Sequence, residues 1–301
     1  MAFGIFMVTT LIGISVLSKI TGISIFQLQD SKNWDLTNPA TMTFMRGMIL
    51  IQFLFLFSIP ALLFAYFSDP HPMRYLGLRA PKNHLYWILG IALIIVGYPF
   101  VEYIGYLNQK IPIGGGAQQW MKGMEEEAAR QIAGMLKVHT PAELFKNLIF
   151  ISLFAGIGEE LFFRGILQRM FIRLTKNSWM GIVLTAAIFS GIHFQFYGFF
   201  PRLFLGILLG AIYWYSGSLW IAIVAHFLYD ATVIVAIYFN PKMLDNPEAS
   251  ILKGQEVQLL IMGIISLVLT IFLLRQMEKK SLSSYEAIYN DDFPKKDDFS
   301  F

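Results

Sequence analysis

The sequence predicts an all-α fold, a polytopic bundle of membrane-spanning helices. Hydrophobic residues make up 56% of the 301 residues and charged residues only 14%, whereas a soluble domain is about one quarter charged. Long apolar runs also recur along the chain, and a run of about 20 residues suffices to cross a hydrocarbon core about 30 Å thick. We therefore expect an integral membrane protein.

Eight apolar stretches are predicted as membrane spans. The sixth and seventh form one continuous apolar run, which we divide at residues 216–218 because their sequence, SGS, favours a turn. The predicted spans cover residues 3–26, 47–67, 85–106, 146–166, 178–199, 202–216, 218–239 and 257–275.

Basic residues in the short loops predict the orientation, because Lys and Arg are retained on the cytoplasmic side. The loops 68–84 and 167–177 each carry three Lys or Arg residues and are expected inside. The loop 28–42 holds only one, and 240–256 holds two lysines against three acids, so both are expected outside. Eight spans with both termini in the cytoplasm satisfy this alternation.

The remaining segments complete a single transmembrane domain over residues 1–280. Residues 117–138 carry apolar side chains at mostly three- and four-residue spacing and are predicted as an interfacial helix. This helix could be a plain surface helix or a lid over a functional site. Residues 281–301 are short, charged and without periodicity, which predicts a disordered cytoplasmic tail. The chain has no cysteine, which excludes disulfides and thiolate chemistry.

Within one predicted span, the sequence GEELFFRG at residues 158–165 places three charged residues close together. A single charge at the centre of a membrane helix costs about 2.5 to 3.5 kcal/mol, so these charges need partners. Glu160 and Arg164 are four residues apart, with the acid first, which favours a salt bridge along one helical face. Glu159 lies about 100° around the helix and has no such partner. It is the better candidate for a general base.

Two neighbouring spans supply further titratable groups. The predicted fifth span carries His193, and the seventh carries His226 and Asp230 four residues apart on one helical face. A bundle can bury such groups economically only by turning them toward one another or toward a water-filled cavity. We therefore expect all of them to converge with Glu159 on one site, rather than to be separate polar core residues.

Such a site supports hydrolysis by either of two routes. Two histidines with carboxylates can hold a divalent metal whose bound water becomes a nucleophile. Alternatively, Glu159 and His193 can activate a water directly, while His226 and Asp230 stabilise the oxyanion on the attacked carbonyl. The chain contains neither a GxSxG motif nor an HExxH motif, and it lacks cysteine.

At these residues the chain resembles the CPBP family of intramembrane proteases, also called the Abi or type II CAAX prenyl protease family. The family signature is EExxxR, FxxxH and HxxxN or HxxxD, and this sequence reads EELFFR (159–164), FSGIH (189–193) and HFLYD (226–230) in the same order. The resemblance covers about residues 145–240. It implies that Glu159 and His193 activate the water, that Glu160 and Arg164 support the site, and that His226 with residue 230 polarises the scissile carbonyl.

Residue 230 departs from the prenyl proteases of this family, which have an amide where this chain has Asp230. An ionised Asp accepts hydrogen bonds but donates none, so it would instead orient His226 or ligate a metal, whereas a protonated Asp230 would keep the carbonyl-polarising role. Members of the family have been described both as metalloproteases and as glutamate-type proteases. We favour the metal-free mechanism over a divalent metal such as zinc; in a metal-dependent site the ligands would be Glu159, His193 and His226.

We therefore predict an intramembrane endopeptidase that cuts a peptide or a membrane-protein substrate near the bilayer interface, in the inner membrane of a bacterium. One alternative is a non-catalytic bacteriocin-immunity or scaffold protein of the same fold. A second is a proton- or ion-coupled transporter, since intramembrane Glu and His also serve as proton relays. The lipid bilayer is the other expected partner, and no nucleic-acid-binding signature is present.

Overall fold

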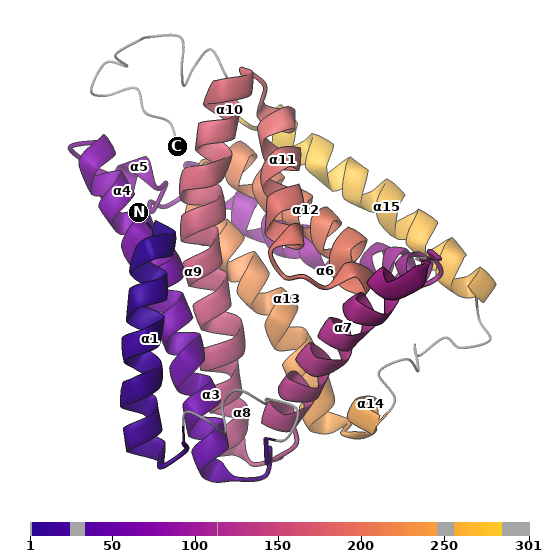
Figure 1. Cartoon of the computed structure of the whole chain (residues 1–301). Helices are drawn as coiled ribbons and strands as arrows, with labels where there is room; N and C mark the ends of the chain where they lie inside the picture. The colour runs from indigo at the N-terminus through magenta and orange to yellow at the C-terminus, as the bar shows by residue number, and fades with distance from the viewer. Residues whose placement is uncertain (1, 25–33, 113, 246–255, 285–301) are drawn as a thin grey trace.

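The computed structural model describes residues 2–24, 34–112, 114–245 and 256–284, and within these ranges it contains helices and connecting loops but no strand. The predicted all-α class is confirmed. Figure 1 shows α9 running through the middle of the molecule, with α1 and α3 on one side of it and α6, α12 and α15 on the other.

The N-terminal part consists of α1 (Ala2–Thr21) packed against a long, continuous helix. That helix has three segments, namely α3 (Pro39–Ile51), the π-helical η2 (Gln52–Ser58) and α4 (Ile59–Ser68). It begins where the side chain of Asn38 accepts a hydrogen bond from the amide of Ala40. Pro60, just after η2, has no N–H for the helical ladder, which accounts for the irregular hydrogen bonding before it.

A second long helix carries the EELFFR sequence. It runs without a break through α8 (Pro141–Asn147), the π-helical η3 (Leu148–Leu153), α9 (Phe154–Phe162), the π-helical η4 (Phe163–Gln168) and α10 (Arg169–Thr175). Thr140 caps its start by accepting a hydrogen bond from the amide of Glu143. It ends at Lys176, whose φ of 54° is left-handed. The predicted span 146–166 thus lies inside a longer helix.

The next helices pack around this one. They are α11 (Ser178–Gly191), the 3₁₀ turn η5 (Phe196–Gly198), α12 (Phe199–Ser216) and α13 (Leu219–Phe239). The division between α12 and α13 falls at the predicted SGS turn, where Gly217 adopts a φ of 64° that suits glycine. The predicted fifth span was too long: the helix ends at Gly191, and residues 192–195 form a turn in which Phe194 has a φ of 53°.

The outer elements close the bundle. Helix α6 (Leu85–Gln109) packs against α15 (Glu256–Lys279), α12 and α13, while α7 (Gly115–Leu136) contacts α8, α13 and η5. The short helices α5 (Pro72–Tyr75) and α14 (Lys242–Asp245) lie in connections. The helix expected over 117–138 is therefore present as α7, and its interfacial position remains a prediction. Most of the predicted disordered tail, residues 285–301, lies outside the described residues.

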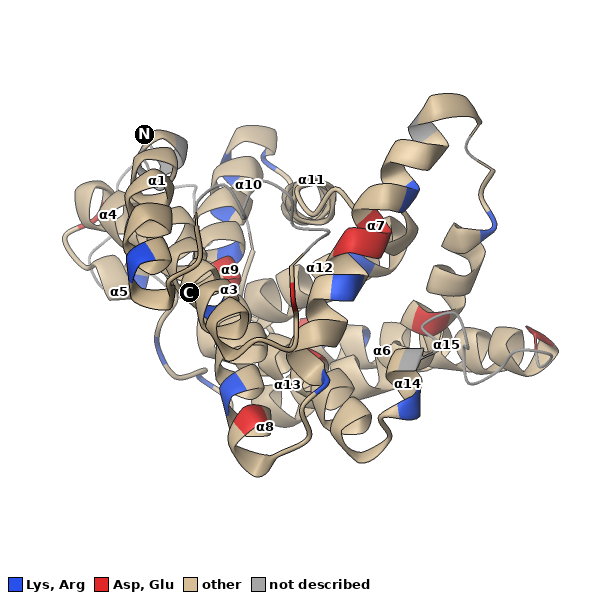
Figure 2. Ribbon diagram, turned by 60° about the horizontal axis from the view of Figure 1, so that its bottom comes forward, with Lys and Arg blue, Asp and Glu red and all other residues tan. Residues whose placement is uncertain are grey.

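Five helices among the described residues are long and apolar enough to cross a membrane, and further apolar helices cover Met7–Thr21 and Ser178–Gly191. The five are Pro39–Ser68, Leu85–Gln109, Phe196–Ser216, Leu219–Phe239 and Glu256–Lys279. This supports an integral membrane protein, while the count of eight spans and the orientation remain predictions. Figure 2 shows that most of the ribbon carries no charge, whereas α7 carries charges of both signs.

The largest hydrophobic cluster lies where α6, α12 and α13 meet, around Leu93, Leu209 and Ile221. Small residues allow α12 to approach its neighbours closely: a Cβ on Gly206 would lie 3.2 Å from the Cα atom of Ala186 on α11. This close packing sets the distance between the helices that carry the candidate site.

Candidate active site

Side chains from α9, α12, α13 and the end of α11 line one cavity of about 330 Å³. Its polar and titratable lining residues are Glu159, His193, Arg202, His226, Tyr229 and Asp230. The structure thus brings together four of the six residues that the sequence singled out. The other two, Glu160 and Arg164, are fully buried behind this lining and contact it through His226.

Glu160 and Arg164 form the salt bridge expected from their spacing. Arg164 Nη1 donates to Glu160 Oε1 at 2.6 Å, and both side chains are buried. Arg164 Nη2 also donates to the carbonyl of Gly206 at 3.2 Å, and the guanidinium carbon lies 4.7 Å from the centre of the Phe189 ring. One turn further on, Gln168 donates to the carbonyl of Gly210 at 3.0 Å. These contacts fix η4 against α11 and α12.

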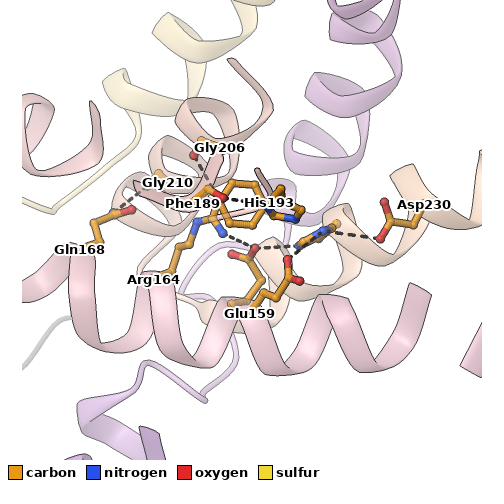
Figure 3. Close-up of polar contacts among 10 residues, drawn as sticks. Glu159, Arg164, Gln168, Phe189, His193, Gly206, Gly210 and Asp230 are labelled. Carbon is orange, nitrogen blue, oxygen red and sulfur yellow. Dashed lines mark hydrogen bonds and ion pairs between the residues drawn. The ribbon is translucent and has the colours of Figure 1, made fainter. Parts of the chain in front are cut away.

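His226 is surrounded by three carboxylates, two of which, Glu159 and Asp230, are labelled in Figure 3. Its Nδ1 donates to Glu160 Oε1 at 2.8 Å. Its Nε2 lies 3.6 Å from Asp230 Oδ2 and 4.0 Å from Glu159 Oε2. Because Nδ1 is held by Glu160, the ring orientation is fixed and Nε2 points between the other two acids. A proton on Nε2 would point between two carboxylate oxygens, neither of which lies within hydrogen-bonding distance.

The sequence had placed His193 on a membrane helix, but the structure places it in the turn after α11. Its Nδ1 is 2.8 Å from the carbonyl oxygen of Phe189. A carbonyl can only accept, so Nδ1 carries the proton and Nε2 of a neutral ring is left as a hydrogen-bond acceptor. The left-handed Phe194 and the bond from Ser190 Oγ to the carbonyl of Phe199 at 2.6 Å define the turn that presents His193 to the cavity.

Glu159 has no basic partner on its own helix, as predicted. Its carboxylate is 9% exposed and lies against the cavity, with His226 Nε2 at 4.0 Å, beyond hydrogen-bonding distance. Gly156, one turn earlier, lets α9 approach α13, since a Cβ there would lie 3.2 Å from the carbonyl oxygen of Ile223 and from the amide of Phe227. Glu159 is therefore a buried carboxylate that remains available to a water in the cavity.

Arg202 also lines the cavity, although it was not among the residues predicted from the sequence. Its position in an apolar run could have indicated it, because Arg202 and Asp230 are the only Asp, Glu, Lys or Arg residues between Lys176 and Lys242. Tyr229 was missed as well, since a tyrosine in an aromatic-rich span carries no distinct signal. Both side chains come from the helices that frame the cavity.

The site geometry does not fit the conditional metal site Glu159, His193 and His226. Among the residues that the structure describes, no three His, Asp or Glu side chains are arranged to hold a metal ion. We therefore derive no step that passes through a metal.

Comparison with known proteins agrees with the resemblance read from the sequence. Residues 141–232, from the start of α8 into α13, match the family model described as type II CAAX prenyl endopeptidase Rce1-like. The chain is also similar to the uncharacterized protein YpbD of Bacillus subtilis (strain 168), with 30% identity over 98 residues, which is 31% of this chain and 47% of that relative. The chain thus spans about half of the length of this relative. No solved structure matches the chain.

The matched region contains all six residues of the predicted site, five on helices and His193 in the turn after α11. Residues 141–232 of this chain therefore form an Rce1-like domain of the type II CAAX prenyl endopeptidase family.

Proposed function

We propose that the protein is a membrane endopeptidase that hydrolyses a peptide bond near the membrane interface with a water activated by Glu159. The observation that carries this proposal is the shared cavity, lined by Glu159, His193, His226 and Asp230 from three separate segments. A protein that only binds a partner has no chemical need to bury such a set. We expect it to act in the inner membrane of a bacterium, on a peptide or on a membrane protein.

In this mechanism Glu159 is the general base. A water in the cavity donates one proton to the Glu159 carboxylate and a hydrogen bond to Nε2 of His193, which the Phe189 carbonyl leaves unprotonated. The water oxygen attacks the scissile carbonyl carbon and forms a tetrahedral intermediate. Glu159 then returns its proton to the leaving nitrogen, so that the C–N bond breaks to a carboxylic acid and an amine.

The groups behind the cavity position those at its surface. Glu160 accepts from both Arg164 and His226, which prevents the His226 ring from rotating. Asp230, 3.6 Å from His226 Nε2, fits the role of a second orienting carboxylate, because an ionised carboxylate cannot donate to a carbonyl oxygen. The departure of this chain at residue 230 is thus compatible with a role in holding His226.

The proposal is tested with the purified full-length chain in detergent and a library of peptides. Glu159→Gln and His193→Ala should each lower kcat by about 10²- to 10⁴-fold, the range expected for a lost general base or its partner. The control is Glu126→Gln, which changes an exposed carboxylate on α7 and should leave kcat unaltered. Glu159→Gln should unfold at a temperature no lower than the wild-type chain, because it removes a buried charge that has no close partner.

Turnover of Glu159→Gln at the wild-type rate would overturn the assignment of the base. If neither the wild-type chain nor any variant cleaved a peptide, the scaffold or transporter alternatives would replace the protease. The substrate can be sought in cells by comparing membrane-proximal peptide termini in strains that carry the wild-type chain or Glu159→Gln.

A further inference from the structure

Arg202 is the one charged group of the cavity for which neither the sequence motifs nor the proposed water activation provides a role. It lies on the first turn of α12, in the same lining as Glu159 and Asp230. None of the three motifs of the family signature includes its position, and it stands in the apolar sequence FFPRLFLG. A cation in such a place is costly, which calls for an explanation in terms of what it binds.

The guanidinium is held in a fixed position over the cavity. Its Nη2 donates to Oε1 of Gln195 at 2.6 Å. It also rests on Gly198, where a Cβ would lie only 2.5 Å from Nη2, so a side chain at residue 198 would displace the guanidinium. Gly198 and Arg202 line the cavity together. The turn between α11 and α12 therefore positions this arginine.

Part of the guanidinium has no hydrogen-bond partner among the described residues. Nη1 of Arg202 is buried and makes no hydrogen bond to any described residue. The nearby acids Glu125 and Glu159 interact with Arg202 electrostatically, but neither forms an ion pair with it within the part of the chain that the structure describes. Leaving a buried N–H donor without an acceptor is unfavourable, and more so on a charged group. This suggests that a ligand atom accepts a hydrogen bond from Nη1.

Hydrolysis by the proposed route also needs a second hydrogen-bond donor beside Nε2 of His226. Negative charge develops on the scissile carbonyl oxygen, and its stabilisation by preorganised donors is usually a large part of catalysis. Glu159 must be ionised to act as a base, and Asp230 offers only acceptors when ionised. His226 can offer only Nε2, because its Nδ1 is bonded to Glu160. Arg202 is the other cationic group in the lining with a free donor.

We propose that Arg202 is a further catalytic residue, whose Nη1 donates to the oxyanion that forms on the scissile carbonyl of the peptide. Arg202 thereby supplies the donor that Asp230 lacks in comparison with an amide at residue 230. Gln195 and Gly198 are positioning residues that hold the guanidinium toward the cavity. This inference rests on the proposed endopeptidase function.

The test compares Arg202→Gln and Arg202→Lys with the wild-type chain. The substrate is a peptide that the wild-type chain cleaves and whose C-terminus is amidated. Arg202→Gln should lower kcat by about 10²- to 10³-fold, the usual cost of one oxyanion donor, with KM changed less than about twofold. Arg202→Lys keeps the charge but not the geometry, so its kcat should lie between those of the wild-type chain and Arg202→Gln. Arg173→Gln, an exposed arginine on α10, is the matched control and should leave kcat unchanged.

A second measurement separates catalysis from folding. A phosphinate analogue of the peptide carries anionic oxygens where the tetrahedral intermediate does, whereas a reduced-amide analogue lacks them. Arg202→Gln should weaken binding of the phosphinate by about the factor that it takes from kcat/KM, and should leave binding of the reduced amide unchanged. A merely structural role of Arg202 would weaken both analogues together.

The outcomes that overturn the inference are distinct from those that overturn the endopeptidase. If Glu159→Gln is inactive but Arg202→Gln keeps full kcat, only the role of Arg202 is wrong. It is also wrong if the loss falls on KM and appears only with peptides that have a free C-terminal carboxylate, because Arg202 would then anchor that carboxylate. If the wild-type chain cleaves no peptide at all, both proposals fail.

Discussion

Glu160 and His226 are joined by a hydrogen bond of 2.8 Å, although 66 residues separate them in the sequence. The same oxygen, Oε1 of Glu160, also accepts from Arg164 at 2.6 Å. One buried carboxylate oxygen therefore ties α9 to the start of η4 and to α13. Because Glu160 is completely buried, this junction holds the imidazole of His226 in place without taking part in the cavity itself.

Replacing Glu160 should destabilise the protein strongly. Glu160→Gln leaves the buried guanidinium of Arg164 without its counter-charge, and removal of one partner from a buried ion pair costs about 3 to 5 kcal/mol. We expect a clearly lower free energy of unfolding for this variant, measured by thermal or denaturant unfolding in detergent. The adjacent Glu159→Gln should not show this loss.

The matched control is another pair at the same helical spacing. Lys122 and Glu126 on α7 are four residues apart with 3.7 Å between their charged atoms, and both side chains are mostly exposed. Glu126→Gln should change the free energy of unfolding by less than about 0.5 kcal/mol, as expected for an exposed pair on a helix. If Glu160→Gln and Glu126→Gln changed the free energy of unfolding equally, burial would not strengthen the contribution of the Glu160 ion pair to stability.

The sequence predicted the contacts of this junction that follow from helical periodicity and missed those that depend on tertiary packing. A spacing of four residues was enough to predict the bond between Glu160 and Arg164. The 2.8 Å bond between Glu160 and His226 depends on how closely α9 and α13 approach each other, and no local pattern encodes that distance. The sequence instead suggested that Glu159, not Glu160, would be the acid most involved with the histidines.

The ends of the elements were predicted less well than their existence, and the site shows the consequence. Apolar residues continue past Gly191, so periodicity extended the fifth span through His193, while the structure turns there to present His193 to the cavity. Arg202 was missed for a related reason, since a single arginine near the start of an apolar run reads as an interfacial charge. Its inward position depends on the same turn.

Close approach of α9 and α13 makes Gly156 sensitive to substitution. A Cβ there would lie 3.2 Å from backbone atoms of Ile223 and Phe227, which cannot move as a flexible side chain can. Gly156→Ala should therefore separate the two helices by a few tenths of an ångström, carry His226 away from Glu160 and lower both kcat and the unfolding temperature. The effects can be measured on the same purified samples.

Gly123 on α7 provides the control for this substitution, since no described residue, apart from its own helical neighbours, has an atom within 4 Å of the position of its Cβ. Gly123→Ala should be neutral or should stabilise the protein by up to about 1 kcal/mol, because alanine is the better helix former. If both substitutions decreased stability by the same amount, the contact between α9 and α13 would not explain the destabilisation by Gly156→Ala.

Glu143, at the start of α8, should make stability depend on pH in the acidic range. A hydrogen bond from Lys146 and an ion pair with Arg46 of α3 hold the pKa of Glu143 below its ordinary value of 4.5. A carboxyl whose pKa is lowered on folding stabilises the protein above its unfolded pKa, and this contribution is lost as the pH falls through the folded pKa. The wild-type chain should therefore exceed Glu143→Gln in stability by a constant amount above about pH 5.

Unfolding temperatures of the wild-type chain and Glu143→Gln, measured from pH 7 to pH 3, check this expectation. The difference between them should shrink below pH 4.5, as Glu143 becomes protonated in the folded state as well as the unfolded one. Lys146→Gln should reduce the difference at neutral pH, because it removes the hydrogen bond with the largest effect on the Glu143 pKa. A difference that persisted undiminished at pH 3 would show that the Glu143 side chain stabilises the connection between α3 and α8 by packing or neutral hydrogen bonds and not by its charge.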